Sequence, residues 1–304
     1  MIRRRLLAVA LALAILPATA REIAITFDDA PTNDSATFTG EERTKRLIAA
    51  LQAAGIQQAA FFCVPRGKPM AELTRLSAYA AAGHIIANHS DTHRNLRNLP
   101  AGEYIADIAA ADAVLKRFPN FRPWFRFPFL AEGETREKRD AVRAGLLAMN
   151  YAQGYVTVDN YDWYLNTLAN NAKKAGQRID EGALRDLYVE VLIGAVEFYD
   201  AIAMKTLGRS PRHVLLLHEN DLAALFVGDL VTELRKRGWT IIGADAAYAD
   251  PIAGIEPDTL FLNQGRVAAI AHTKGAKPID LVQSLEDEAP LEALFAARVT
   301  KSVR

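Results

Sequence analysis

Short apolar runs alternate along the chain with longer segments in which apolar residues recur at helical spacing. The runs with the length and composition of strands are 23–27, 59–64, 84–87, 124–129, 155–158, 213–217 and 240–242. The helices predicted between them are 39–54, 70–82, 100–118, 135–149 and 221–236. This alternation indicates parallel strands covered by helices, and about seven strands favour a distorted (β/α) barrel of the α/β class.

Two segments interrupt the alternation. Residues 164–210 form a long helical stretch, which we interpret as an insertion near the site within a domain covering 21–250. Its apolar positions predict a packed helix: Leu184, Leu187, Val191, Ile193 and Val196. Residues 251–304 form a C-terminal extension that we expect to pack on the domain, with a strand predicted at 266–271.

The N-terminus has the pattern of a signal peptide. Three arginines at 3–5 precede an apolar run at 6–16, and Ala18-Thr19-Ala20 supplies a cleavage signal. The alternative is an uncleaved membrane anchor, but the run is too short to span a bilayer comfortably. We therefore expect residues 1–20 to be removed and the protein to be exported to the periplasm or outside the cell.

Charge and cysteine content exclude several classes of protein. The 304 residues contain 36 Lys and Arg against 36 Asp and Glu, whereas a nucleic-acid binder normally carries a basic surplus. Cys63 is the only cysteine, which excludes an intramolecular disulfide and any site with several cysteine ligands. Its surroundings predict a buried strand position. This suits an oxidising compartment, where an exposed free thiol would be a liability.

Two polar groups at predicted strand ends suggest a metal site, because the active site of a barrel lies where its strands end. Asp28 and Asp29 end the first strand, although Pro31 close behind also fits a simple turn. His89 and His93 are four residues apart and would share one face if a helix began there. Two histidines and a carboxylate form a typical open zinc site, and the alternative is two unrelated surface histidines.

Three further polar groups follow other predicted strands. Arg126 lies among aromatic residues, where it could also be a buried arginine with a structural partner. The segment 159–163 contains two acids and a tryptophan, and Asp159 could also cap a helix. His218 ends an apolar strand, which is the usual place of an acid or base, although a lone histidine there can also be structural.

Together the five groups resemble the motifs of the polysaccharide deacetylases of carbohydrate esterase family 4, the nodulation-protein-B homology domain. The matching segments are Thr26-Phe27-Asp28-Asp29, His89-Ser90-Asp91-Thr92-His93, Arg126-Phe127-Pro128-Phe129, Asp159-Asn160-Tyr161-Asp162-Trp163 and Leu216-Leu217-His218. The resemblance implies a divalent metal, with Zn²⁺ as the first candidate, held by Asp29, His89 and His93. It also implies that Asp28 is the general base and that Arg126 orients it.

The same resemblance implies roles for the remaining motif residues. His218 would be the general acid, tuned by Asp162, and the backbone N–H of Phe129 would help stabilise an oxyanion. Trp163 and Leu216 would line a pocket for the acetyl methyl group. The chain departs from the family pattern at Ala30, where glycine is usual, and at Phe129, where tyrosine is common.

The expected activity is removal of N-acetyl groups from an N-acetylated saccharide, with release of acetate. Chitin oligomers, peptidoglycan and exopolysaccharide all remain possible substrates. Alternatives are an O-acetyl esterase, a deacylase of a non-sugar amide, and an inactive carbohydrate-binding protein on the same scaffold. No nucleic-acid partner is expected, nor any membrane partner after signal cleavage.

Overall fold

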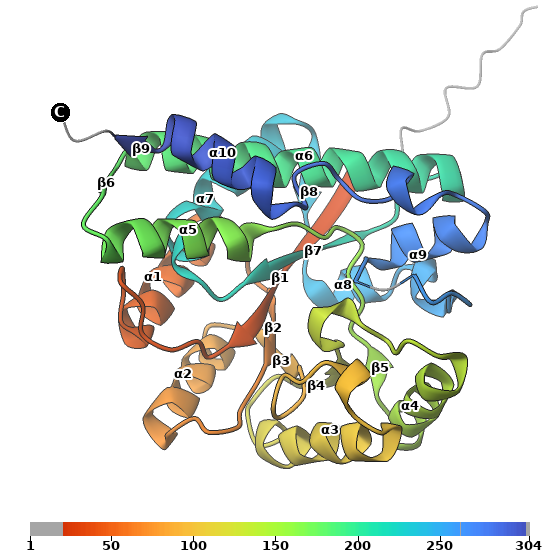
Figure 1. Ribbon diagram of the computed structural model, residues 1–304. Helices are drawn as coiled ribbons and strands as arrows, with labels where there is room; N and C mark the ends of the chain where they lie inside the picture. Colours follow the sequence, from red (N-terminus) through yellow and green to blue (C-terminus); the bar gives the residue numbers. More distant parts are fainter. Residues whose placement is uncertain (1–20, 262, 302–304) are drawn as a thin grey trace, which may run out of the picture.

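The computed structural model describes residues 21–261 and 263–301, so the predicted signal peptide lies outside the described residues. Its centre is the long buried strand β1 (Arg21–Ala30), which crosses the molecule in Figure 1. The other strands of the main sheet are β2 (Ala60–Cys63), β3 (Ile85–Asn88), β4 (Phe121–Phe125), β5 (Ala152–Gln153), β7 (His213–His218) and β8 (Trp239–Ile241). Every pair in this sheet is parallel, as predicted from the strand–helix alternation.

The strand order is β5-β4-β3-β2-β1-β7, with β8 also paired to β1. After β5 the chain runs on to Val158, which forms a single parallel bridge with Leu215 of β7. Residues 152–158 therefore connect the two ends of the sheet, and the predicted class, a distorted barrel of about seven parallel strands, is confirmed. The prediction of a regular strand over 155–158 is wrong. The backbone N–H of Val214 donates to the side-chain hydroxyl of Thr157, and this interrupts the backbone pairing with β7.

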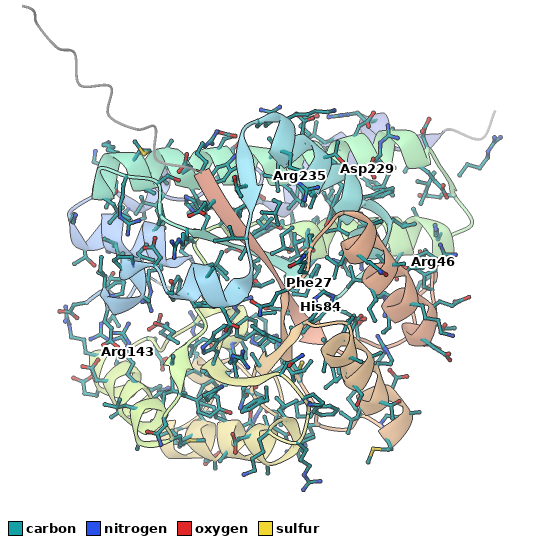
Figure 2. The ribbon with its side chains drawn as sticks, turned by 180° about the vertical axis from the view of Figure 1, so that it is seen from behind. Phe27, Arg46, His84, Arg143, Asp229 and Arg235 are labelled. Carbon is teal, nitrogen blue, oxygen red and sulfur yellow. The ribbon has the colours of Figure 1, made fainter. Side chains whose placement is uncertain are left out.

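Helices cover both faces of the sheet. They are α1 (Gly40–Ala53), α2 (Met70–Ala81), α3 (Ala101–Leu115), α4 (Arg136–Ala148), α5 (Asp162–Lys174), α6 (Glu181–Leu207), α7 (Asp221–Lys236), α8 (Ala244–Tyr248), α9 (Arg266–Thr273) and α10 (Glu288–Arg298). Helix α1 begins at the expected capping box, in which Thr39 and Glu42 exchange hydrogen bonds. Figure 2 shows charged side chains such as Arg46 and Arg143 at the edge of the molecule, with Phe27 near its centre.

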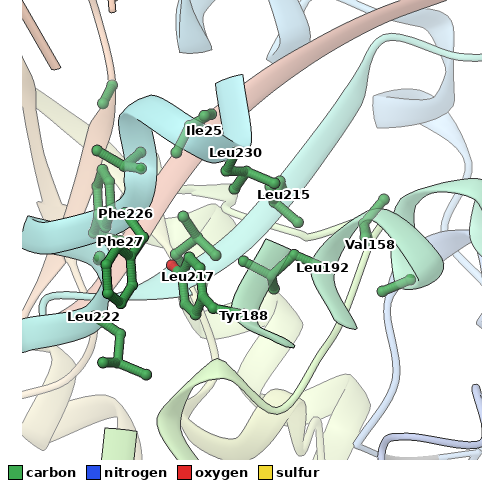
Figure 3. Packing of buried hydrophobic residues seen from close by; sticks show 14 of the residues in the cluster. Ile25, Phe27, Val158, Tyr188, Leu192, Leu215, Leu217, Leu222, Phe226 and Leu230 are labelled. Carbon is green, nitrogen blue, oxygen red and sulfur yellow. The ribbon is translucent and has the colours of Figure 1, made fainter. Parts of the chain in front are cut away.

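Helices α5 and α6 occupy the segment that breaks the alternation. All five apolar positions of the predicted packed helix are buried. In Figure 3, Tyr188 and Leu192 of α6 lie in one cluster with Leu215 and Leu217 of β7 and with residues of α7. The long helix α6 thus shares the core of the sheet.

The C-terminal extension packs on these helices. Helix α9 contacts α6, and α10 lies beside both α5 and α6 (Figure 1). A short antiparallel pair joins β6 (Arg178–Ile179) to β9 (Thr300–Lys301). The strand predicted at 266–271 is wrong: these residues belong to α9, in which Val267, Ile270 and Ala271 are buried at helical spacing. Among the described helices, none has the length and apolarity needed to cross a membrane.

Candidate active site

Asp28 and Asp29 lie at the carboxyl end of β1, where the strand is irregular. Neighbouring side chains of a regular strand point to opposite faces, yet both carboxylates line one pocket. The pairing of β1 with β2 shifts register between Phe27 and Ala30, and Asp29 is left-handed with φ of 69°. This bulge turns Asp29 toward the pocket, while Asp28 remains 2% exposed beneath it.

The two motif histidines reach Asp29 from the loop after β3. The segment does not begin a helix, so a shared helix face does not explain how the two histidines meet: Ser90 and His93 are left-handed, with φ of 67° and 54°. These two turns nevertheless bring both imidazoles to the same carboxylate. Oδ1 of Asp29 lies 3.2 Å from Nε2 of His93 and 3.7 Å from Nε2 of His89. The three ligand atoms lie within 4.8 Å of one another.

The chemistry of these three groups fits a divalent cation. Oδ1 of Asp29 is buried and accepts no hydrogen bond from any residue of the described chain. Nδ1 of His89 lies 2.8 Å from the carbonyl oxygen of Arg126, which can only accept, so Nδ1 carries the hydrogen and Nε2 is left to bind a metal. Burial lowers the pKa of His89 to about 4, which keeps it neutral as a ligand must be.

Electrostatics also favour an ionised Asp29. Burial raises the pKa of this carboxyl group, but the neighbouring imidazoles, His93 first, outweigh it and leave the pKa below its ordinary value. One carboxylate oxygen and two imidazole nitrogens suit Zn²⁺ and several other divalent transition metals. A possible metal site is therefore present, and its donor set does not decide which metal binds.

Asp28 is paired with a fully buried arginine. Nη1 of Arg126 lies 2.5 Å from Oδ1 of Asp28 and 3.0 Å from Oγ1 of Thr26. Oδ2 of Asp28 lies 3.6 Å from Nε2 of His89, on the side of the metal ligands. The predicted pairing of Arg126 with Asp28 is present in the structure, and it leaves one carboxylate oxygen toward the pocket.

The guanidinium group of Arg126 is fixed on its other sides as well. Nε donates to the carbonyl oxygen of Gly154 at 2.7 Å, and Nη2 donates to the hydroxyl of Tyr248 at 2.9 Å. Its central carbon lies 3.7 Å from the centre of the Phe62 ring. Arg126 therefore cannot turn away without losing several contacts, and Asp28 is held in one orientation.

His218, at the end of β7, is paired with Asp162, as the resemblance implied. Nδ1 of His218 lies 2.7 Å from Oδ1 of Asp162, and Oδ2 of Asp162 accepts from the backbone N–H of His218 and from Nδ2 of Asn220. Burial lowers the pKa of His218, but the attraction of Asp162 outweighs it and raises the pKa to about 10. His218 therefore carries a proton at neutral pH, with Nε2 left for the pocket.

Eight of the ten predicted site residues line one pocket of about 530 Å³. These residues are Asp28, Asp29, His89, His93, Phe129, Trp163, Leu216 and His218. The other two, Arg126 and Asp162, are buried and hydrogen-bonded to pocket residues from behind. Leu216 is 5% exposed, whereas Trp163 is 37% and Phe129 52% exposed. The pocket thus combines a buried apolar floor with accessible aromatic rings.

Phe129 follows β4 in an unusual backbone conformation. The extended run predicted at 124–129 holds as far as Phe127 and is wrong from Pro128 onward, where a short helical turn begins. Phe129 and Leu130 are left-handed, with φ of 59° and 50°. The turn places the Phe129 ring 4.8 Å from that of His93.

Four further pocket residues come from the C-terminal extension, and no sequence pattern pointed to them. They are Asn263, Gln264, Val282 and Glu286. They follow no predicted strand and lie beyond the last motif, so no local pattern could identify them. Asp159 also lines the pocket, and it does not cap a helix, since its Oδ1 accepts from the adjacent N–H of Asn160.

Glu219 is another buried acid near the site, and like Glu286 it was not predicted from the sequence. It is fully buried directly after His218, and its carboxylate accepts from Arg75, from the hydroxyl of Tyr79 and from the backbone N–H of Thr32. Its own N–H donates to the carbonyl oxygen of Asp28 at 2.9 Å. Its position directly after His218 was the feature of the sequence that could have pointed to it.

Comparison with known proteins supports the resemblance. Residues 16–149 match the sequence profile of the family "Polysaccharide deacetylase", which includes the first three motifs. A curated relative, the peptidoglycan-N-acetylglucosamine deacetylase of Bacillus cereus, is 24% identical over 153 residues. That match covers 49% of this chain and 50% of the relative, so the chain spans about half the length of the curated relative. The predicted resemblance is confirmed.

Solved structures share the fold. A "T48 deacetylase with substrate" has a TM-score of 0.50 and 21% identity, covering 76% of this chain and 92% of that one. The Bc1960 peptidoglycan N-acetylglucosamine deacetylase, in complex with an N-hydroxybenzamide derivative, has a TM-score of 0.52 and 20% identity, covering 76% of this chain and 89% of that one. A family 4 pseudoenzyme from Bacillus anthracis has a TM-score of 0.53 and 16% identity, covering 75% and 66%. At these identities the likeness establishes the fold, and activity has to be argued from the residues.

Proposed function

We propose that the chain is a metal-dependent hydrolase that removes N-acetyl groups from an N-acetylated saccharide, and the match of residues 16–149 to the polysaccharide deacetylase profile supports this. One observation carries the proposal. Asp29, His89 and His93 converge within 4.8 Å, beside a second carboxylate, Asp28, that a buried arginine holds in place. An inactive binding protein on this scaffold would not need this combination of an orphaned ligand oxygen and an oriented base.

The residues divide the chemistry of amide hydrolysis among them. A divalent cation bound by Asp29, His89 and His93 would act as a Lewis acid toward the acetyl carbonyl and would make water more acidic. Asp28 accepts the proton of the attacking water, because Arg126 fixes one of its oxygens and leaves the other toward the metal ligands.

His218 supplies the second proton transfer. The nitrogen of an amide leaves poorly until it is protonated, and His218 carries a proton at neutral pH because its pKa is raised to about 10. Asp162 occupies Nδ1, so Nε2 donates to the departing nitrogen. The C–N bond breaks, and the products are acetate and a free amine on the sugar.

Trp163 and Leu216 belong to the apolar part of the pocket lining, and we assign the acetyl methyl group to them. The N–H of Phe129, held in a left-handed turn beside His93, is the proposed donor to the developing oxyanion. Zinc is the proposed metal, since both histidines and the carboxylate are ligands that it commonly takes. The curated relative acts on peptidoglycan N-acetylglucosamine, which supports an N-acetylated saccharide as substrate.

The proposal also includes export. The arginine cluster and the apolar run of residues 1–20 have the order of a signal peptide, and peptidoglycan and chitin lie outside the cytoplasm. N-terminal sequencing of the protein recovered from the periplasm or medium is expected to begin at Arg21. Recovery of a chain beginning at Met1 from the membrane fraction would contradict the proposed cleavage and export.

Acetate release tests the activity. The protein is incubated with chitin oligomers and, separately, with acetylated xylan, before and after chelation and re-addition of Zn²⁺. We expect acetate from chitin oligomers, loss after chelation and recovery with the metal. His272 contacts Thr259 away from the pocket, so His272→Ala serves as a matched control for His93→Ala. Acetate from neither substrate would refute the proposed activity.

A further inference from the structure

Glu219 holds both ends of the short segment that carries Asp29. This segment is 28–32, which covers the end of β1 and the two residues after it. The backbone N–H of Glu219 donates to the carbonyl oxygen of Asp28 at 2.9 Å. Its Oε2 accepts from the backbone N–H of Thr32 at 2.7 Å and also from the hydroxyl of Thr32. One residue that follows β7 therefore fixes the start and the end of the bulge in β1.

The bulge needs such support because of its backbone conformation. Asp29 is left-handed, with φ of 69°, and a residue with a side chain keeps this conformation only where its surroundings impose it. On the side of β2, the carbonyl oxygen of Ala30 accepts from the N–H of Val64 at 3.0 Å. On the side of β7, the contacts are those of Glu219, since β1 lies between β2 and β7.

Glu219 is itself fixed by a buried network. It is fully buried, and its Oε1 accepts from Nη2 of Arg75 at 2.6 Å and from the hydroxyl of Tyr79 at 2.8 Å. Nη1 of Arg75 also donates to the carbonyl oxygen of Thr32 at 2.7 Å, and its Nε donates to Oγ1 of Thr44 at 2.7 Å. These contacts come from α1 and α2, so the two helices keep Glu219 in place against the bulge.

The network requires a hydrogen-bond acceptor at each carboxyl oxygen of Glu219. Arg75 and Tyr79 donate to one oxygen, and the N–H of Thr32 donates to the other. A carboxylate accepts at both oxygens, whereas an amide accepts at one end and donates at the other. Glutamine at this position would therefore direct its NH₂ group toward at least one of these donors.

The same residue connects the bulge with His218. Glu219 follows His218 directly in the sequence, and Asp28 is the partner of His218 in the register of β1 and β7. A shift of Glu219 would therefore change the position of Asp29 relative to His218 as well as relative to the two other predicted metal ligands.

We propose that Glu219 is a positioning residue, which holds the left-handed bulge of β1 so that Asp29 faces His89 and His93. The inference rests on the proposed function, because it concerns a ligand of the proposed metal. Glu219 is fully buried and acts through Asp29. Without its contacts at both ends of the segment, Asp29 can turn away from the two histidines, and metal binding weakens.

Zinc binding by Glu219→Gln tests the proposal without requiring hydrolysis. The full chain is freed of metal with a chelator and titrated with Zn²⁺ in competition with a chromophoric chelator. We expect the dissociation constant for Zn²⁺ to rise at least about tenfold, as is common when a residue that orients a metal ligand is changed. In acetate release from chitin oligomers, kcat should fall while KM changes little, because the pocket lining is unaltered. An unchanged dissociation constant in the folded variant would overturn the proposal.

Asp250→Asn is the matched control for a general loss of stability. Asp250 is also a buried acid, which is paired with Arg209 at 2.6 Å and accepts from the backbone N–H of Arg212 at 3.0 Å. Arg212 immediately precedes β7, so Asp250 lies at the opposite end of this strand from Glu219. In urea unfolding both variants should lose stability, but Asp250→Asn should keep the wild-type zinc dissociation constant. Equal weakening of zinc binding in both variants would refute a specific role for Glu219.

Thr32→Val is a milder second variant. Valine keeps the backbone N–H and a similar shape, but it lacks the hydroxyl that donates to Glu219 and accepts from Arg43. We expect a smaller rise of the zinc dissociation constant in the same direction. If Glu219→Gln does not fold, an unchanged dissociation constant in Thr32→Val overturns the proposal.

Measurements on the wild type separate this inference from the proposed function. No zinc binding by the wild type would refute both. Zinc binding that is weakened in Glu219→Gln, without acetate from the wild type, would support the positioning role and refute deacetylation. Acetate from the wild type, with unchanged zinc affinity and kcat in Glu219→Gln, would support deacetylation and refute the role of Glu219.

Discussion

Replacing Asp28 perturbs both the proposed base and the partner of a buried cation. Arg126 is 1% exposed, and Asp28 supplies the carboxylate that faces it at 2.5 Å. In Asp28→Ala the guanidinium keeps the neutral acceptors Thr26, Gly154 and Tyr248 but loses its counter-charge. Removing one partner of a buried pair costs about 3–5 kcal/mol of the free energy of unfolding. For a chain of this size we expect Tm to fall by roughly 5–8 °C.

Asp28→Asn separates the role of Asp28 as a base from its role as the partner of Arg126. The amide has nearly the same volume, and its oxygen still accepts from Arg126, so we expect a smaller fall in Tm than for Asp28→Ala. An amide cannot accept a proton at neutral pH, and both variants should therefore lose at least about 100-fold in the rate of acetate release. Zinc content, measured by elemental analysis, should stay at the wild-type level, because the proposed ligands are Asp29, His89 and His93.

A double variant supplies the control for the electrostatic argument. Adding Arg126→Met to Asp28→Ala removes the unpaired cation, and much of the lost stability should return while activity stays low. A wild-type Tm for Asp28→Ala alone would contradict the reasoning about the buried pair. Wild-type acetate release by Asp28→Asn would exclude Asp28 as the base, and an empty metal site in that variant would make it a ligand instead.

Three further changes test other parts of the site. His93→Ala should lower zinc content well below one ion per chain, and full occupancy in that variant would remove His93 from the ligand set. The raised pKa of His218 stabilises the fold at pH values below its unfolded pKa of about 6.5, and this contribution is lost as the pH rises through about 10. Urea unfolding of Asp162→Asn should therefore show a weaker fall of stability with rising pH than the wild type, and identical pH profiles would contradict the pairing. Gly154→Ala would place its Cβ 2.3 Å from the Phe62 ring, and we expect a loss of about 1–3 kcal/mol in urea unfolding, whereas unchanged stability would show that the ring moves aside freely.

The central strands were predictable because both of their faces are buried. Strands of that kind appear in a sequence as short continuous apolar runs, as at 23–27 and 213–217, which lie within β1 and β7. Helix α1 was predictable for a different reason, since the Thr39 capping box marks its start. In both cases the decisive interactions are local, or depend only on burial.

The wrong predictions involve segments whose conformation depends on distant residues. The apolar pattern of 266–271 is too short to separate strand from helix, and packing on α6 decides for a helix. Regular pairing at 155–158 fails because a threonine side chain replaces a backbone acceptor. At 89–93 the two histidines meet Asp29 through left-handed turns, which spacing alone does not reveal.

In the candidate site, too, some residues are positioned by the strands alone and others by contacts between distant segments. The residues proposed for the reaction follow β1, β3, β4 and β7 directly, so parallel strands alone bring them to one edge of the barrel. Glu286 and Gln264 reach the pocket only because α9, α10 and the intervening chain pack on α5 and α6. The pocket is therefore completed by two parts of the chain, the ends of the strands and the C-terminal extension, and only the first of these carries a pattern that can be recognised in the sequence.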